Sequence, residues 1–130
     1  MKSLIKNRDR VKQVIDFTGV QNGKMHPSDV DAVLEFDNEA LILMEVKYKF
    51  NKIPRGQKLL LERIADRWGE KAIVLKIEHN FNNDKLNIPL NECEVTQIYY
   101  NKKWTIIDNT NLIEYLNKLG NSWNIKKCKF

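Results

Sequence analysis

The chain has 130 residues, the length of a single domain. Its 42% hydrophobic residues are enough to build a core, which excludes a disordered chain and a small fold held by disulfides. The longest apolar run, Ala40 to Met44, is far shorter than the roughly 20 residues that cross a bilayer. The first residues also lack an apolar stretch of signal-peptide length, so we expect a cytoplasmic protein with one domain over residues 1–130.

The chain is moderately basic, with 22 Lys and Arg residues against 17 Asp and Glu residues and a net charge of +5. This excess favours a polyanionic partner, although a soluble protein with a charged surface would carry the same charge. The two cysteines, Cys93 and Cys128, fit a reducing compartment, and together with the two histidines they lack the spacing of a zinc site. Any bound metal is therefore expected to have oxygen ligands.

Hydrophobic periodicity predicts the elements of the N-terminal half. Apolar residues near one face predict a helix from about Leu4 to Phe17, and clustered Gly, Asn and Pro predict a loop over 18–28. Residues 30–36 alternate as in a strand, with the even-numbered side chains on its apolar face. After a turn at 37–39, the almost continuous apolar run over 40–48 predicts a strand in the centre of a sheet.

The C-terminal half continues the mixture of helices and strands. A loop at 51–56 precedes a helix that ends at about Trp68, with Gly69 as its stop. Residues 71–78 are predicted as a buried strand and 80–91 as a loop. Residues 94–107 are predicted as a hairpin that turns at Asn101-Lys102, and 111–119 as a helix capped at Gly120. This order predicts an α/β or α+β domain with a mixed central sheet flanked by helices.

Three charged residues on the first two strands form the main candidate site. If the turn between these strands has three residues, Phe36 pairs with Ala40 and Asp31 lies opposite Glu45. A two-residue turn would shift the register by one and move Asp31 away from Glu45. Glu45 and Lys47 point to the same face because they lie two residues apart on one strand.

Two opposed carboxylates repel each other unless a cation lies between them. A hard divalent ion such as Mg²⁺ or Mn²⁺ prefers oxygen ligands, which Asp31, Glu45 and the carbonyl of Val46 would supply. Lys47 would then stand beside the attacking water and stabilise charge on a phosphate. The residues therefore outline a site for phosphodiester hydrolysis, with a structural Glu45–Lys47 pair at a strand end as the alternative.

Three short runs carry these residues: His26-Pro27-Ser28-Asp29-Val30-Asp31-Ala32, Glu45-Val46-Lys47-Tyr48 and Gly56-Gln57-Lys58. Together they resemble the PD-(D/E)XK nuclease superfamily, and most of all its small phage and prophage endonuclease-like members, which are related to Holliday-junction resolvases. The resemblance covers residues 17–79. It implies one nuclease-like domain with a restriction-endonuclease-like core, in which an extra strand within 18–25 would precede the strand of Asp31.

The resemblance also implies roles for single residues. Asp31 and Glu45 would be the metal carboxylates and Lys47 the catalytic lysine, while Asp29 competes with Asp31 because it has the same strand parity. Gln57 matches a glutamine that some branches place at the start of the second core helix. It lies on the buried stripe of its helix. Its side chain is interpreted either as a polar group of the site or as a simple amide cap at the helix N-terminus.

Further candidates lie around this set. Some branches add a glutamate from the first helix, but this chain has only Asp9 and Asp16 there, which leaves a second metal position without that ligand. His79, at the end of a strand, is a candidate for contact with phosphate, as is His26, although solvated or structural roles are more common for such histidines. Basic residues that follow the second strand are candidates for phosphate binding: Lys49, Lys52 and Arg55.

We therefore predict an endonuclease that depends on Mg²⁺ or Mn²⁺ and hydrolyses phosphodiester bonds in DNA, with branched DNA among the candidate substrates. The alternatives are a non-catalytic nucleic-acid-binding or inhibitor protein that retains the nuclease fold, and a protein-interaction module. No membrane partner is expected. A homodimer is predicted because two symmetric strands of a junction need two cuts, and because the apolar row Ile98, Tyr99 and Tyr100 would offer a contact surface.

Overall fold

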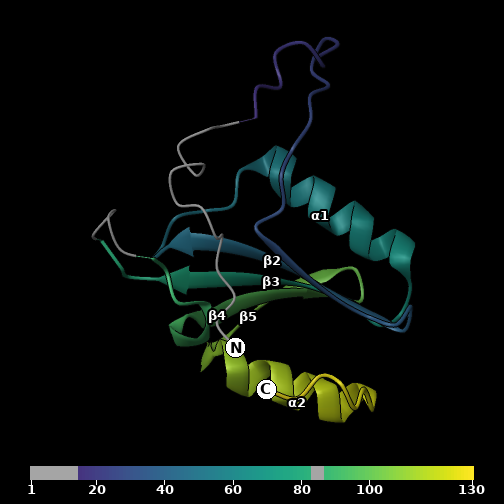
Figure 1. Cartoon of the computed structure of the whole chain (residues 1–130), viewed down its shortest axis with the longest axis vertical. Coiled ribbons are helices and arrows are strands. Elements are labelled where there is room, and N and C mark those ends of the chain that lie inside the picture. The colour runs from purple at the N-terminus through teal and green to yellow at the C-terminus, as the bar shows by residue number, and fades with distance from the viewer. Residues whose placement is uncertain (1–14, 83–86) are drawn as a thin grey trace.

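The structure is a computed structural model that describes residues 15–82 and 87–130. A five-stranded sheet in the order β1-β2-β3-β4-β5 lies between two helices, with α1 on one face and α2 on the other (Figure 1). The predicted mixture of helices and a mixed sheet is confirmed. The elements in chain order are β1 Ala32–Phe36, β2 Ala40–Tyr48, α1 Arg55–Trp68, β3 Ala72–His79, the 3₁₀ turn η2 Leu90–Glu92, β4 Glu94–Tyr100, β5 Lys103–Asn111 and α2 Leu112–Trp123.

The sheet is mixed because β2 and β3 are parallel and joined through α1, whereas the other neighbouring strands are antiparallel. In the β1–β2 hairpin Phe36 pairs with Ala40 and Ala32 with Met44, which is the register predicted from a three-residue turn. Asp37 makes this turn possible with a φ of 49°, a left-handed conformation that aspartate tolerates. The hairpin thus carries Glu45 toward the chain segment that precedes β1.

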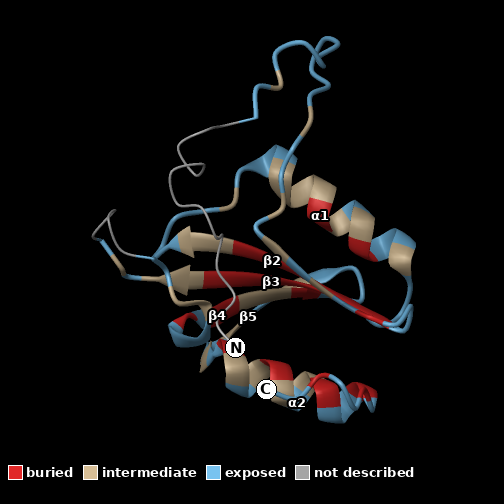
Figure 2. Ribbon diagram, viewed as in Figure 1, coloured by how far each residue is buried: buried red, intermediate tan, exposed pale blue. Residues whose placement is uncertain are grey.

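Apolar side chains fill both faces of the sheet, which is why β2 and β3 are buried along most of their length (Figure 2). The α1-side core includes Leu41, Leu43, Leu61, Ala65, Val74 and Tyr99. The α2-side core includes Ile42, Met44, Ile73, Leu75, Leu112 and Leu116. In residues 15–82 and 87–130, no helix is long and apolar enough to cross a membrane.

The start of β1 differs from the prediction. The strand begins at Ala32, and Asp31 lies in a bend just before it. Val30 therefore packs with the α1-side core, whereas Ala32, which was predicted on the same face, packs with the α2-side core. The bend frees the Asp31 side chain from the alternation of the strand.

Two further predictions concern the N-terminal region. The predicted helix over residues 4–17 falls mainly on residues 1–14, which lie outside the described part, and Ile15 to Phe17 are not helical. The extra strand expected within 18–25 is reduced to a single bridge between Asn22 and Met25 in a segment of turns.

The apolar row on which the homodimer prediction rests is used within the chain. Ile98 packs against the α2-side core, and Tyr99 is buried in the α1-side core, where its hydroxyl donates a hydrogen bond of 2.8 Å to Asp66. Tyr100 packs its ring against Trp123 with a centroid distance of 6.0 Å. Packing within the chain thus accounts for Ile98 and Tyr99, whereas Tyr100 remains 39% exposed.

The prediction that the last helix ends at Gly120 is wrong. The helix continues to Trp123, and Asn124 terminates it with a left-handed φ of 57°. Gly120 is needed inside the helix because a Cβ at this position would collide with the backbone carbonyl oxygen of Cys128, in the C-terminal segment that folds back onto α2. The glycine therefore provides space for the returning chain.

Gly120→Ala should consequently lower the free energy of unfolding by about 2 kcal/mol, the usual scale for overpacking in a tightly packed region. Urea unfolding monitored by circular dichroism measures this change. Gly56→Ala is the matched control, since Gly56 lies in α1 with open space around its Cα, and it should leave the stability unchanged or raise it. Equal stability of the two variants would contradict the close packing at Gly120.

Candidate functional site

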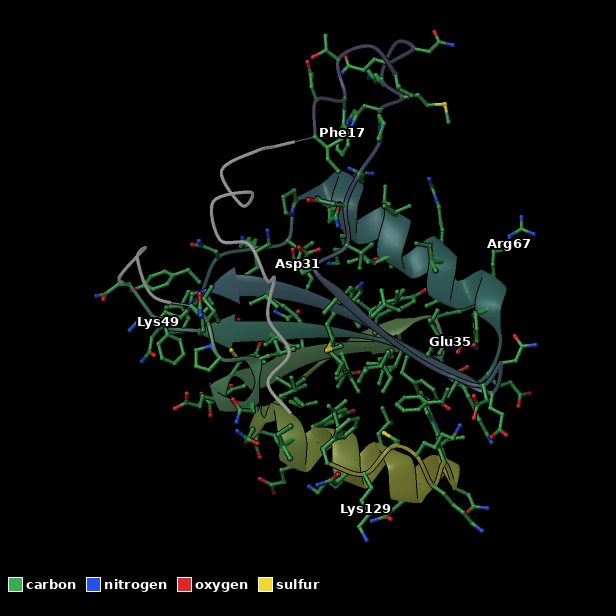
Figure 3. All side chains as sticks on the ribbon, in the orientation of Figure 1. Phe17, Asp31, Glu35, Lys49, Arg67 and Lys129 are labelled. Carbon is green, nitrogen blue, oxygen red and sulfur yellow. The ribbon has the colours of Figure 1, made fainter. Side chains whose placement is uncertain are left out.

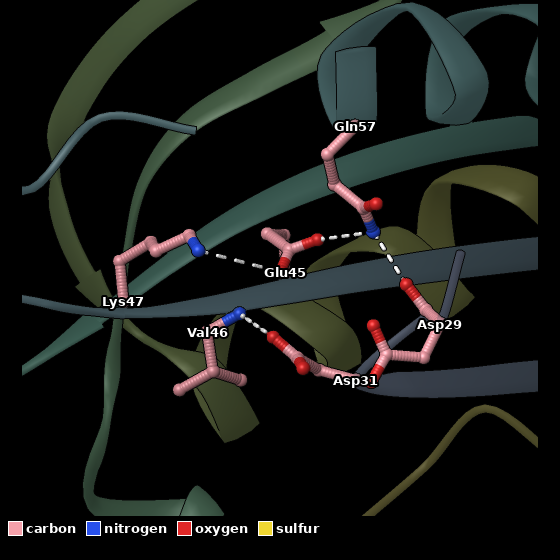
Figure 4. A network of polar contacts seen from close by, with 6 residues as sticks. All are labelled: Asp29, Asp31, Glu45, Val46, Lys47 and Gln57. Atoms are coloured by element: carbon pink, nitrogen blue, oxygen red, sulfur yellow. Dashed lines mark hydrogen bonds and ion pairs between the residues drawn. The ribbon is translucent and has the colours of Figure 1, made fainter. Parts of the chain in front are cut away.

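A group of polar residues meets at the carboxyl end of β2, beside the first turn of α1. Along β2 the odd-numbered side chains point toward α1, so Leu41 and Leu43 pack into the α1-side core and Glu45 and Lys47 follow on the same face. The other contributors are the segment before β1 and Gln57 of α1 (Figure 4). The apolar part of β2 thus anchors the strand, and its polar end supplies the site.

Glu45 is the centre of the group and is only 4% exposed. One of its carboxylate oxygens accepts a hydrogen bond of 2.9 Å from the Gln57 amide. The pKa of Glu45 is raised to about 7, first by burial and then by the neighbouring Asp31 carboxylate, which together outweigh the lowering effects of Gln57 and Lys47. Glu45 is therefore a carboxyl group that costs stability when it is ionised.

Asp31 reaches the same place from the bend before β1 (Figure 3). Its carboxylate accepts a hydrogen bond of 2.8 Å from the backbone N–H of Val46. In a strand the N–H and C=O of one residue point to the same edge, so the Val46 carbonyl also points toward the side of Asp31. Two carboxylates and one backbone carbonyl therefore converge at this edge of β2.

Gln57 ties the group together. Its amide nitrogen donates to Glu45 and also to the backbone carbonyl of Asp29, at 2.5 Å. It does not cap the helix, since the N-cap residue of α1 is Pro54 and has no side-chain cap bond. Of the two neighbouring aspartates, Asp29 thus takes part through its main chain and Asp31 through its carboxylate.

Lys47 stands at the open end of the group. Its ammonium lies 3.8 Å from the second Glu45 oxygen, and its side chain is 26% exposed against 5% for Glu45. This separation is longer than a hydrogen bond, so the ammonium is held near Glu45 by charge and remains accessible from solvent. A negatively charged group that approaches the carboxylates would meet Lys47 first.

Sequence reasoning missed two charged residues on β3, Lys76 and Glu78. They are the parallel-ladder partners of Glu45 and Lys47, with the order of charges reversed. Lys76 is only 5% exposed and donates to Glu78 at 2.8 Å. Their signal was visible as Lys-x-Glu over 76–78, at the end of the apolar run that begins at Ala72, where an unpaired charge would be costly.

Glu78 is held by three donors. In addition to Lys76, the Thr96 hydroxyl donates at 2.9 Å and the backbone N–H of Phe50 at 3.0 Å. Burial raises the pKa of Glu78, but the hydrogen bonds from Lys76, Phe50 and Thr96 outweigh it and the pKa is lowered. Glu45 and Glu78 thus lie on one face of the sheet, but the pKa of Glu45 is raised and that of Glu78 is lowered.

The remaining candidates are not brought to the carboxylates. His79 alternates to the sheet face opposite Glu45, and its ring packs against Tyr48 and Phe81 while Nδ1 accepts from the Phe81 N–H at 3.1 Å. His26 lies exposed in the loop before β1, where Nδ1 is 3.0 Å from the Pro27 carbonyl. Both histidines have local structural contacts.

The predicted phosphate-binding residues lie along the segment that leads from β2 into α1. Lys49 and Arg55 are exposed, and the Lys49 ammonium lies 5.6 Å from the centroid of the exposed Phe50 ring (Figure 3). Lys52 lies on the rim of a cavity on the α1 face. These residues follow the carboxyl end of β2 in the chain, whereas the contacts of Glu45 are with Gln57 and Lys47.

The donor set fits a hard divalent cation. In residues 15–82 and 87–130, no three side chains of the types His, Cys, Asp and Glu are grouped as a metal site. Two carboxylates and a carbonyl nevertheless match Mg²⁺, which keeps several waters and is commonly held by one or two carboxylates. Burial and the neighbouring Asp31 carboxylate raise the pKa of Glu45, and a cation between the two carboxylates would offset the cost of ionising Glu45.

Comparison with known proteins identifies no relative: the chain matches no family model, no curated protein and no solved structure.

Proposed function

We propose that this protein is a metal-dependent endonuclease of the PD-(D/E)XK type, with a restriction-endonuclease-like core, that hydrolyses phosphodiester bonds in DNA. One observation carries the proposal: a buried Glu45 whose pKa is raised to about 7 lies beside Asp31, with Lys47 two residues further along the same strand face. Burying one carboxylate next to another costs stability and is typical of functional sites.

Each residue then has a definable role. Asp31, Glu45 and the Val46 carbonyl would hold a divalent cation, which would supply Lewis-acid stabilisation and lower the pKa of water. Lys47 stabilises negative charge that develops on the attacked phosphate and helps to orient the water. Gln57 fixes the Glu45 carboxylate through their hydrogen bond, so it acts as a positioning residue.

A protein that only binds nucleic acid gains nothing from this arrangement. Carboxylates repel phosphates, so the Asp31–Glu45 pair would oppose the attraction of a phosphate to Lys47. The pair is useful if a cation converts it into a positive site for phosphate. A purely structural Glu45–Lys47 pair is disfavoured for a separate reason: the two groups are 3.8 Å apart, which is too long for a hydrogen bond.

The proposal is tested by incubating the protein with supercoiled plasmid, linear duplex and a four-way junction in the presence of Mg²⁺, Mn²⁺ or EDTA. Cleavage that requires the cation and is lost in Glu45→Gln supports it. Binding of DNA without cleavage under all conditions would favour the alternative of a non-catalytic binding or inhibitor protein.

Gln57→Ala should lower the cleavage rate by about 10²-fold, the scale on which a misplaced group is felt. Gln57→Glu is the sharper variant. It replaces the amide donor with a third carboxylate that repels Glu45, so the cleavage rate of this variant should fall further. DNA binding in EDTA should change little in Gln57→Ala. Single-turnover rates and fluorescence anisotropy measure the two quantities, and a rate unchanged in both variants would contradict the positioning role.

Charge reversal at Lys49, Lys52 and Arg55 should weaken DNA binding and flatten its salt dependence. Each lost phosphate contact lowers the slope of log K against log salt by about one. Lys118→Glu with Lys126→Glu is the control, with one exposed residue in α2 and one after it, and it should keep the slope near that of the unchanged protein. A slope that falls only in the control would place the DNA on the α2 face.

A further inference from the structure

A cavity of about 320 Å³ opens on the α1 face next to the candidate site. Five parts of the chain build it: the segment before α1, α1 itself, and the strands β3, β4 and β5. Its lining consists of Lys52, Ile53, Lys58, Lys76, Gln97 and Trp104. The volume lies at the lower end of the range of ligand pockets, about 300–1,000 Å³, so it suits a small group.

The cavity concentrates positive charge that the protein does not neutralise. Lys76 is paired with Glu78, but neither Lys52 nor Lys58 has an ion-pair partner within residues 15–82 and 87–130. Two further carboxylates lie near the lining: Glu62 accepts a hydrogen bond from the Trp104 indole at 2.6 Å, and Glu45 is the ladder partner of Lys76. The balance of these groups favours an anion.

The lining also offers hydrogen-bond donors in fixed positions. Lys76 is held in place by its buried side chain, and among the described residues its ammonium uses one of three donors, toward Glu78. The Lys58 ammonium lies 5.0 Å from the centroid of the Trp104 ring, which orients it on the cavity wall. The Gln97 amide adds a neutral donor. Phosphate oxygens, which accept several hydrogen bonds, match such a set.

The cavity adjoins the carboxylates. Lys76 is the ladder partner of Glu45, so their backbones are one strand spacing apart, about 4.8 Å. Lys58 follows Gln57 directly in α1. A strand of nucleic acid whose phosphate faces Asp31 and Glu45 could therefore place a neighbouring phosphate in the cavity.

We infer that this cavity is a phosphate subsite that binds a phosphate of the nucleic-acid strand next to the one that would be cleaved. The inference rests on the proposed function for its substrate, and it assigns Lys52, Lys58 and Lys76 to substrate binding. It also sets the path of the strand, from Asp31 across β2 toward Trp104 on β5.

Trp104 provides a local signal for the test. In ¹H–¹⁵N spectra recorded in EDTA, inorganic pyrophosphate should shift the indole resonance of Trp104 in a saturable way. The indoles of Trp68 and Trp123 act as internal references, since neither lines the cavity. Trp104→Phe assigns the resonance, and chloride at equal ionic strength controls for salt.

Lys52→Gln with Lys58→Gln should weaken pyrophosphate binding about tenfold or more, because hydrogen bonds to charged groups are lost. Lys118→Gln with Lys126→Gln is the matched control and should bind as the unchanged protein does. No saturable shift at Trp104, or equal weakening in both double variants, would overturn the subsite. A DNA duplex should compete with pyrophosphate for Trp104, and failure to compete would overturn its role in binding the strand.

This test is separate from the test of cleavage. If pyrophosphate and DNA bind at Trp104 but no DNA is cleaved with any cation, the subsite stands and the nuclease proposal fails. If DNA is cleaved but Trp104 does not respond to pyrophosphate, the nuclease proposal stands and the subsite fails.

Discussion

Replacement of Asp31, Glu45 or Lys47 by alanine is expected to reduce DNA cleavage by about 10³-fold or more, the scale of a lost electrostatic contact in a preorganised site. Asp31→Ala and Glu45→Ala remove oxygen ligands, whereas Lys47→Ala removes the charge that faces the phosphate. DNA binding in EDTA should be unchanged or tighter in the two carboxylate variants, because a negative charge near the phosphate is gone. Single-turnover cleavage and anisotropy titrations measure both effects.

Asp29→Ala is the matched control for Asp31→Ala. Asp29 contributes its backbone carbonyl to Gln57, which alanine retains, so cleavage by Asp29→Ala should stay close to that of the unchanged protein. Loss of activity in Asp29→Ala together with an active Asp31→Ala would show that the first metal ligand has been assigned to the wrong aspartate. Normal cleavage by all four variants would rule out the nuclease function.

Glu45→Gln is expected to stabilise the protein at high pH in metal-free buffer. Because the pKa of Glu45 is raised from 4.5 to about 7, the protonated form stabilises the fold. That contribution is fully present below about pH 4.5 and is lost as the pH rises through about 7. The shift corresponds to on the order of 3 kcal/mol. Glutamine keeps an acceptor for the Gln57 amide without the charge, so the stability of Glu45→Gln should not fall as the pH rises through this range.

Urea unfolding at about pH 5 and about pH 8 measures the difference, with Glu70→Gln as an exposed control that should follow the unchanged protein. Mg²⁺ should stabilise the unchanged protein at the higher pH but not Glu45→Gln, because only a species that binds the folded state shifts the equilibrium. Equal stabilisation of both proteins by Mg²⁺ would mean that the cation binds away from Glu45.

The sequence predicted the β1–β2 hairpin well because local rules determine it. The turn at 37–39 fixes the register, and the register brings Glu45 to the level of Asp31. The alternation along β2 then places Lys47 on the face of Glu45. The bend at Asp31 was beyond these rules, and with it Val30 packs into the α1-side core while Ala32 packs on the other face.

Lys76 and Gly120 show which information a single sequence lacks. The position of Lys76 beside Glu45 follows from the parallel register of β2 and β3, which no short turn sets. The role of Gly120 inside α2 depends on the returning segment at Cys128, a contact between parts of the chain that no periodicity reveals. In both cases a tertiary contact determined what the local pattern left open.

The parallel pairing of β2 with β3 also bears on the order of folding. The hairpins β1–β2 and β4–β5 close over short turns, whereas the β2–β3 ladder forms only after the chain has passed through α1. Contacts that close longer loops carry a larger entropic cost and form later. We therefore expect Glu45 to remain hydrated in an early hairpin and to lose its water only when α1 docks and Gln57 reaches it, so that the repulsion with Asp31 arises last.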